Sequence, residues 1–441
     1  MSPSPSSSRT ETIHDSNSSS STNNRTSNSP NDGQHENRPS TPKSLLLTHA
    51  SHITWNYFPL TMSTLSLSVL LSNQPFTFPS LLTLGTILFV TGLVLFVLLT
   101  FAILIRFYTH PGAFANSLHH PTESFFVGSW WVSVALLLNC IQSYGVPSSG
   151  PWLVTAMEVL FWVFIGAAIL VAVFQYHVIY ERESLSIQDA LPAWILPAYP
   201  FLVTGNLAGA IVASQAQEAG LRIWIAGLTV QGLGWMLAIW MYSVYLARLI
   251  SGTLPEEGGR PGMYVAVGPA AYTSAALASL GSTSKNLLPN SHFAQSLSST
   301  LALPPTTIAA ITATLGLLAA IFTFLIAFFF FLLSTLSILR GVRKMSFTLN
   351  WWAFIFPNAG MTIALLAIAE QLGSKGMQGV GAGATVVLVG MWFFVAGSHI
   401  LAVVRGGTAG LVPWVGGVNG EGRGRGKARK RGRRGEREVD D

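Results

Sequence analysis

Charged residues are scarce in this sequence. Asp, Glu, Lys and Arg together make up 10% of the 441 residues, whereas globular domains contain about 25%. Hydrophobic residues make up 50% of the chain, and its mean hydropathy is +0.48. A chain with so little charge cannot cover the surfaces of two or three soluble domains, so the composition predicts that most of it lies in lipid.

Cysteine is almost absent, since Cys140 is the single one. One cysteine cannot form an intramolecular disulfide, and no C-x-x-C or Cys/His grouping is present to hold zinc. The pair His119 and His120 suggests a metal-dependent membrane enzyme, but such sites need several histidines at helical spacing and the others are scattered. We therefore predict no metal, no cofactor and no enzyme activity.

The N-terminus lacks a short apolar stretch followed by a small-residue cleavage site, so we expect no signal peptide and expect the first membrane span to direct insertion. Residues 1–50 are rich in Ser, Thr, Asn and Pro, which predicts a disordered, cytoplasmic tail. Residues 405–441 form a Gly/Arg-rich basic tail. Such a tail resembles nucleic-acid-binding segments, but beside a membrane domain we predict that it binds anionic lipid and no nucleic acid.

Between the tails, residues 51–404 contain apolar stretches long enough to cross a membrane. The sequence predicts an all-α membrane domain of ten transmembrane helices: 51–73, 79–107, 124–146, 152–180, 190–213, 221–250, 262–282, 306–340, 348–372 and 378–404.

The orientation follows from basic residues near the span ends, because Lys and Arg accumulate on the cytoplasmic side. With ten spans, both tails share one side with the loops after even-numbered spans. That side holds Arg106, Arg182, Arg248, Arg260, Arg340, Arg343 and Lys344, whereas the opposite side holds Arg222, Lys285 and Lys375. We predict that both termini are cytoplasmic.

Proline is concentrated in the odd-numbered spans. It occurs there at Pro59, Pro192, Pro197, Pro200, Pro269 and Pro357, although the third span has none in its interior. Short links between most odd spans and the next even span predict five helical hairpins. Proline frees a backbone carbonyl and bends a helix, so we predict that Pro59, Pro197, Pro200, Pro269 and Pro357 kink odd spans that surround a central pore. The alternative is that a membrane helix merely tolerates proline.

Neutral polar residues on the odd spans predict a hydrated path, namely Asn139, Gln142, Asn206 and Asn358. Hydrogen bonding between helices is the alternative explanation for each of them. A path without fixed charge suits an anion that must also leave, because binding has to stay weak. Glu158 and Glu370 are candidates for relaying protons or steering charge, although they could also simply anchor their helices at the interface.

Several segments resemble one known family. They include RFYTHPGAFANSLHHPTESFFVGS at 106–129, LPAWILPAYPFLVTGNLAGAIVA at 191–213 and FTLNWWAFIFPNAGMTIALLAIAEQLG at 347–373. Together, and in this order, they resemble the tellurite-resistance/dicarboxylate transporter family over residues 51–404. That family includes fungal malate permeases, fungal sulphite efflux pumps and plant slow anion channels.

The resemblance implies ten helices in five hairpins, a pore in each subunit and commonly a homo-trimer. It also implies an aromatic pore gate, and the matching residue is Phe356, which precedes Pro357. The expected function is transport of a small organic anion, such as malate or another C4-dicarboxylate, across the plasma membrane, with proton coupling left open. Sulphite efflux, or an inorganic anion channel of the same family, is the alternative.

Overall fold

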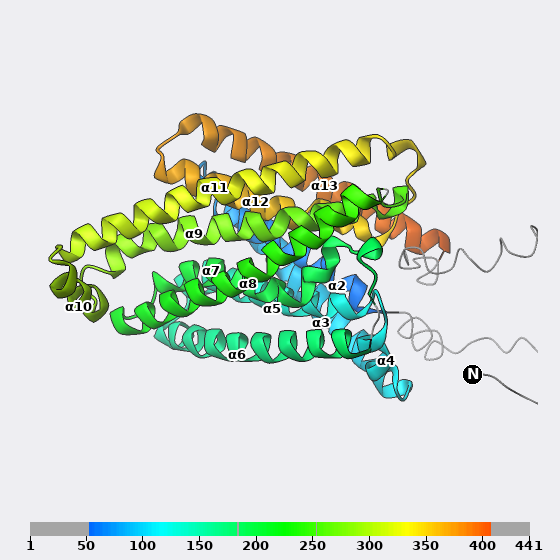
Figure 1. Ribbon diagram of the computed structural model, residues 1–441, viewed down its shortest axis with the longest axis horizontal. Coiled ribbons are helices and arrows are strands. Elements are labelled where there is room, and N and C mark those ends of the chain that lie inside the picture. Colours follow the sequence, from blue (N-terminus) through cyan, green and yellow to red (C-terminus); the bar gives the residue numbers. More distant parts are fainter. Residues whose placement is uncertain (1–52, 183–184, 253, 407–441) are drawn as a thin grey trace, which may run out of the picture.

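The computed structural model describes residues 53–182, 185–252 and 254–406, and all regular structure within these ranges is helical (Figure 1). The predicted N-terminal tail and all but the first residues of the predicted basic tail lie outside the described residues. The α-helices are α2 (Phe58–Ser72), α3 (Leu81–Thr109), α4 (Ala113–His119), α5 (Val127–Cys140), α6 (Pro151–Arg182), α7 (Tyr199–Val212), α8 (Gln217–Ser251), α9 (Val267–Leu287), α10 (His292–Leu301), α11 (Pro305–Leu339), α12 (Phe356–Gln371) and α13 (Lys375–Gly406).

Nine helical segments in the described residues are long and apolar enough to cross a membrane. Their bounds lie within a few residues of the second to tenth predicted spans, which are thereby confirmed as span candidates. The first predicted span differs, because α2 has only 15 residues. The 3₁₀ segment η1 (Trp55–Tyr57) precedes it directly, so the continuous helical stretch runs from residue 55 to residue 72.

The spans pack as hairpins. Contacts join α2 to α3, α5 to α6, α7 to α8, α9 to α11 and α12 to α13, so each odd span lies against the even span that follows it. The link between α9 and α11 is long enough to form the separate helix α10, which lies at the far end of the molecule from the two described chain ends (Figure 1). The five predicted hairpins are therefore present.

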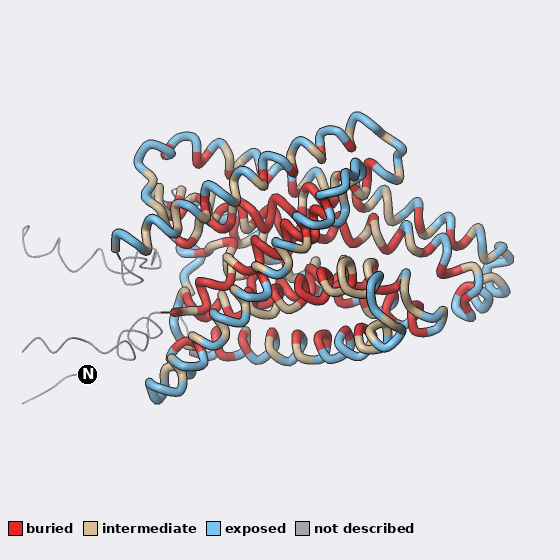
Figure 2. Tube along the Cα trace, turned by 180° about the vertical axis from the view of Figure 1, so that it is seen from behind, coloured by how far each residue is buried: buried red, intermediate tan, exposed pale blue. Residues whose placement is uncertain are grey.

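The odd spans form the interior of the protein. Between 72% and 89% of the most apolar stretch is buried in each of the four long odd spans, against 11% to 33% in the even spans. The short helix α2 is also buried along nearly its whole length. Figure 2 shows the buried residues concentrated in the central helices. Because α2 packs on α5, α5 on α7, α7 on α9, α9 on α12 and α12 on α2, the inner helices form a closed ring.

Each inner span starts with a 3₁₀ segment. Besides η1, these are η2 (Ser124–Phe126), η6 (Pro192–Ala198), η7 (Glu257–Ala266) and η9 (Leu349–Phe354), and an α-helix follows each of them.

This arrangement shows where the predicted prolines lie. Pro59, Pro200 and Pro357 are each the second residue of an α-helix, Pro269 is the third, and Pro197 lies inside η6. The prolines therefore lie where the inner spans change from 3₁₀ to α-helix, and a kink at these positions stays a prediction.

Candidate functional site

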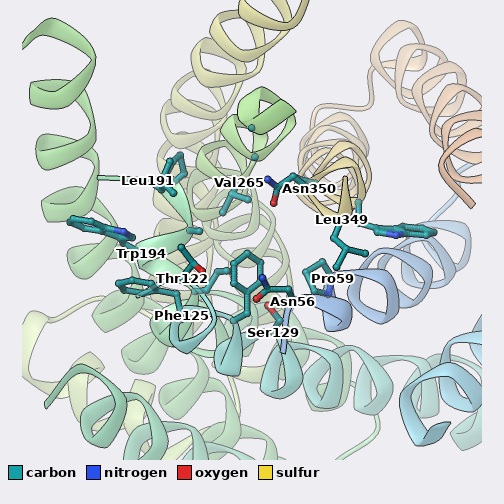
Figure 3. Close-up of a pocket in the computed structure, with 18 of the residues that line it drawn as sticks. Asn56, Pro59, Thr122, Phe125, Ser129, Leu191, Trp194, Val265, Leu349 and Asn350 are labelled. Atoms are coloured by element: carbon teal, nitrogen blue, oxygen red, sulfur yellow. The ribbon is translucent and has the colours of Figure 1, made fainter. Parts of the chain in front are cut away.

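Two cavities lie within the ring of inner helices, one towards each of its ends. The first, on the side of the described chain ends, has an empty volume of about 1070 Å³ including its mouth (Figure 3). The 3₁₀ segments and the first turns of the inner helices line this proximal cavity. The second, of about 1680 Å³ including its mouth, is lined by the last turns of the same helices, and we call it the distal cavity.

An aromatic cluster of Tyr199, Tyr272 and Phe356 separates the two cavities. On α12, Phe356 lines the proximal cavity and Ile363 the distal one. Tyr272 lies at the same level on α9, one turn before Ala275, which lines the distal cavity. The cluster therefore occupies the level at which the proximal cavity ends.

The three rings are in direct contact. The Phe356 ring lies 4.9 Å from the Tyr272 ring, nearly parallel to it, and 5.5 Å from the Tyr199 ring. The Tyr272 hydroxyl donates to the Phe356 carbonyl oxygen at 3.3 Å, and the Tyr199 hydroxyl donates to the Val265 carbonyl oxygen at 2.8 Å. Phe356 is only 4% exposed. These contacts hold the two tyrosines in place, whereas the Phe356 side chain is held by packing alone.

Glycine makes room for the two tyrosine rings. A Cβ atom at Gly360 would lie 2.5 Å from the Tyr272 ring, and one at Gly268 would overlap the Tyr199 hydroxyl. The sequence analysis did not identify either tyrosine. The glycines are the signal that was available, because a glycine in a buried helix often marks a close approach.

Three of the four predicted polar path residues line the distal cavity: Asn139, Gln142 and Asn206. Gln142 lies in a π-helical turn, Ile141–Gly145, and donates to the Ser214 hydroxyl at 3.1 Å. Such turns are frequent at functional sites. Its Oε1 atom is buried without a hydrogen-bond partner.

Asn358 differs from these three, because it lines neither the proximal nor the distal cavity. Its side-chain amide donates to the Phe354 carbonyl oxygen at 2.9 Å, within its own span. The structure thus places Asn358 on the helix that carries Phe356, with its side chain hydrogen-bonded within the same span.

The two predicted relay carboxylates lie in different places. Glu370 is exposed and lines the distal cavity. Glu158, on α6, forms an ion pair with Arg222, on α8, at 3.2 Å, and it lines neither cavity. Only Glu370 is therefore placed to act on a passing ion.

The five prolines that were predicted to line a pore also lie in different places. Pro59 and Pro357 line the proximal cavity, whereas Pro197 and Pro200 are buried and line neither cavity. Pro269 borders a separate small cavity of about 230 Å³ beside Tyr242. Two of the five prolines predicted to line a pore therefore face the path between the cavities.

Among the residues that the structure describes, no Asp, Glu, Lys, Arg or His lines the proximal cavity. Four of the five inner α-helices, namely α2, α5, α7 and α12, contribute residues near their N-terminal ends to its wall. A cavity without a fixed countercharge does not retain an anion strongly.

A buried ion pair fixes one wall of the proximal cavity. Arg106, at the end of α3, contacts Glu123 at 2.6 Å and also donates to the Ile53 carbonyl oxygen at 3.1 Å. The Trp55 amide in turn donates to Glu123 at 3.4 Å. The sequence analysis used Arg106 only as one of the basic residues that indicate the orientation, and it did not identify Glu123. The pair holds the start of η1, and hence Asn56, against the cavity.

No group of three or more His, Cys, Asp or Glu side chains that could hold a metal ion occurs in the part of the chain that the structure describes. Cys140 is fully buried, with its sulfur 3.8 Å from the Leu65 carbonyl oxygen.

Comparison with known proteins gives one family and several relatives. The family model described as "Voltage-dependent anion channel" (SLAC1) matches residues 52–400. The malic acid transport protein of Schizosaccharomyces pombe is 28% identical over 344 residues, which are 77% of this chain and 76% of that protein. A putative malic acid transport protein of the same organism is 27% identical, covering 79% of each chain. The sulfite efflux pump of Arthroderma benhamiae is 24% identical, covering 77% of this chain and 88% of the pump.

Proposed function

The chain belongs to the voltage-dependent anion channel family, and within this family we propose that it transports malate or another C4-dicarboxylate. Membership shows a multi-pass membrane protein concerned with anion transport, and it confirms the prediction that the chain is not an enzyme. The choice of a dicarboxylate is supported by the two malic acid transport relatives, which are more similar to this chain than the sulfite efflux pump is.

The observation that carries the proposal is the pair of cavities separated by the aromatic cluster. In the proposed path an anion moves between the proximal and the distal cavity past Phe356. In the distal cavity Asn139, Gln142 and Asn206 replace part of its hydration shell. Neutral polar groups bind an anion weakly enough for release, which transport requires.

The proposal is tested by anion flux into liposomes that contain the purified protein. Malate, sulphite, nitrate and chloride are compared at two pH values, with protein-free liposomes as the control. We expect malate to be carried faster than the three inorganic anions. Sulphite flux without malate flux would instead support the alternative of sulphite efflux, and flux of chloride or nitrate alone would support an inorganic anion channel.

We further propose that the stretch from residue 55 to residue 72 is the first membrane span, which brings the number of spans to ten. Its 18 residues extend about 27 Å at the α-helical rise of 1.5 Å per residue, which is close to the thickness of the hydrocarbon core. It is also surrounded by other inner helices, so it can be short without exposing its ends to lipid. A homo-trimer, with one path in each subunit, stays a proposal that rests on the family resemblance.

With ten spans both termini lie on one side of the membrane, and the basic residues near the span ends support the proposal that this is the cytoplasmic side of the plasma membrane. The proximal cavity then opens to the cytoplasm and the distal cavity to the outside. We expect tags at residue 20 and after residue 425 to be accessible only from the cytoplasm, and a tag near Ser291, in the link between α9 and α10, to be labelled from outside. Accessibility of the two terminal tags from opposite sides would contradict this orientation.

Residues 407–441, which lie outside the described residues, hold nearly all of the basic tail. We propose that its Lys and Arg side chains bind anionic lipid of the cytoplasmic leaflet, each contributing about 1 kcal/mol near the surface.

Glu370 is proposed to relay protons at the outer mouth. If malate crosses in a partly protonated form, uptake should rise as the external pH falls, and Glu370→Gln should flatten this dependence because an amide cannot exchange a proton. Initial rates of malate uptake between pH 5 and pH 8 measure the effect. Glu158→Gln is the control, because its carboxylate pairs with Arg222 away from both cavities. An unchanged pH profile in well-expressed Glu370→Gln would reduce Glu370 to an interfacial anchor.

A further inference from the structure

The proximal cavity holds polar atoms that the protein itself does not satisfy. Asn56 is 7% exposed, and its buried Oδ1 atom has no hydrogen-bond partner among the described residues. Ser129 is fully buried, and its hydroxyl also lacks a partner there. Both residues line the proximal cavity. A buried polar atom without a partner is destabilising, so two of them beside one cavity indicate that something else supplies their hydrogen bonds.

The two groups come from packed elements and lie close together. Asn56 is on η1 and Ser129 is on the first turn of α5, and these two elements are in contact. Figure 3 shows both side chains on one wall of the cavity, with the amide of Asn350, on η9, across from them. Apolar side chains, such as those of Phe125, Leu191 and Trp194, form most of the remaining wall.

The two unpaired groups differ in what they can bind. A serine hydroxyl can donate to an anionic oxygen, whereas the amide oxygen Oδ1 can only accept. A single ligand satisfies both groups if it carries an oxygen that accepts from Ser129 and an O–H group that donates to Asn56. Chloride and nitrate have no hydrogen to donate, whereas a hydroxy acid or a singly protonated dicarboxylic acid has one.

We infer that Asn56 and Ser129, with Asn350 facing them, form a binding subsite for the anion in the proximal cavity, and that this subsite selects organic acids that carry an O–H group. The inference rests on the proposed transport of a C4-dicarboxylate and assigns the residues that recognise it. Ser129 donates to the carboxylate, and Asn56 accepts from the hydroxyl or the protonated carboxyl. The ligand is thus recognised before it reaches Phe356.

The test is the half-saturation concentration for malate in liposomes in which the protein has one orientation. Ser129→Ala removes the donor without adding bulk. We expect it to raise the half-saturation concentration on the proximal side about tenfold, as expected for one lost hydrogen bond to a charged group. Malate flux well below half-saturation should fall by a similar factor in both directions, because transport across one path must obey detailed balance.

Ser133→Ala is the matched control. Ser133 lies one turn further along α5 and is equally buried, but its hydroxyl already contacts the Thr61 hydroxyl at 2.6 Å and donates to the Ser129 carbonyl oxygen at 2.9 Å. Loss of the Ser133 hydroxyl should lower the melting temperature and leave the half-saturation concentration for malate unchanged. A second variant, Asn56→Ala, should reduce the ratio of malate flux to chloride flux, and it tests the inference independently if Ser129→Ala folds poorly.

The outcomes separate the inference from the proposed function. Absence of malate flux in the wild-type protein would contradict the proposed function. Normal malate flux in the wild-type protein, together with wild-type half-saturation and selectivity in Ser129→Ala and Asn56→Ala, would overturn the subsite and leave transport standing. In that case water, and not the transported acid, satisfies the two groups.

Discussion

Phe356→Ala is expected to increase anion conductance per molecule at the membrane by about tenfold or more. The ring fills the space between Tyr199 and Tyr272 and is almost completely buried. An anion stripped of water without replacement ligands meets a barrier of many kcal/mol at such a point. Truncation to a methyl group admits water, and each 1.4 kcal/mol removed from the barrier gives about a tenfold faster passage. Currents normalised to the surface protein level measure the effect.

The competing explanation is that Phe356 only packs the core. Removal of a buried phenylalanine ring is destabilising by about 3–5 kcal/mol, so expression of the variant would fall without a gain in conductance. Phe161→Ala controls for this loss, because Phe161 is fully buried on α6 and lines neither cavity. We expect both variants to be less stable and only Phe356→Ala to conduct more. Equal or lower conductance per molecule in Phe356→Ala would show that the ring does not close the path.

Gly128→Ala is expected to destabilise the fold strongly. Gly128 is the second residue of α5, and a Cβ atom there would overlap the backbone carbonyl group of Leu196 in η6. A backbone clash cannot be relieved by rotating a side chain, so α5 and α7 would have to separate and the ring of inner helices would open. We expect the melting temperature to fall by 10 °C or more, a shift of roughly several kcal/mol for a chain of this size, together with loss of flux.

Gly166→Ala is the matched control for this prediction. Gly166 lies within α6 and is exposed, and a Cβ atom there would meet nothing within 4 Å. Alanine is a better helix former than glycine by about 1 kcal/mol, so this variant should be at least as stable as the wild type. Equal melting temperatures for the two variants would contradict the close packing of α5 against η6.

The sequence predicted most of the fold because membrane spans depend on local composition. A run of about 20 apolar residues defines a span wherever it packs, and nine of the ten predicted runs agree with the structure within a few residues. The prolines and polar residues of the odd spans also predicted that these spans form the interior. The sequence did not predict the 3₁₀ segments, since the propensities of 3₁₀ and α-helices overlap and the choice depends on packing.

The candidate site was predicted less completely because its parts are far apart in the sequence. Phe356 was identified, but Tyr199 and Tyr272 contact it from α7 and α9, and no local pattern reveals such a contact. Glu158 was considered together with Glu370 because both are rare charges in apolar spans. Only the packing of α6 on α8 shows that Glu158 has Arg222 as its partner.

The location of the path inside the ring is tested most directly by blocking it. Cys140 is the single cysteine, so Cys140→Ala gives a cysteine-free background. Asn206→Cys then places a thiol in the distal cavity, and Ser299→Cys places one on the exposed surface of α10, outside that cavity. A charged thiol reagent added from the distal side should stop malate flux through Asn206→Cys, with malate slowing the reaction, and should leave Ser299→Cys active. Complete modification of Asn206→Cys with unchanged malate flux would show that the anion takes another route.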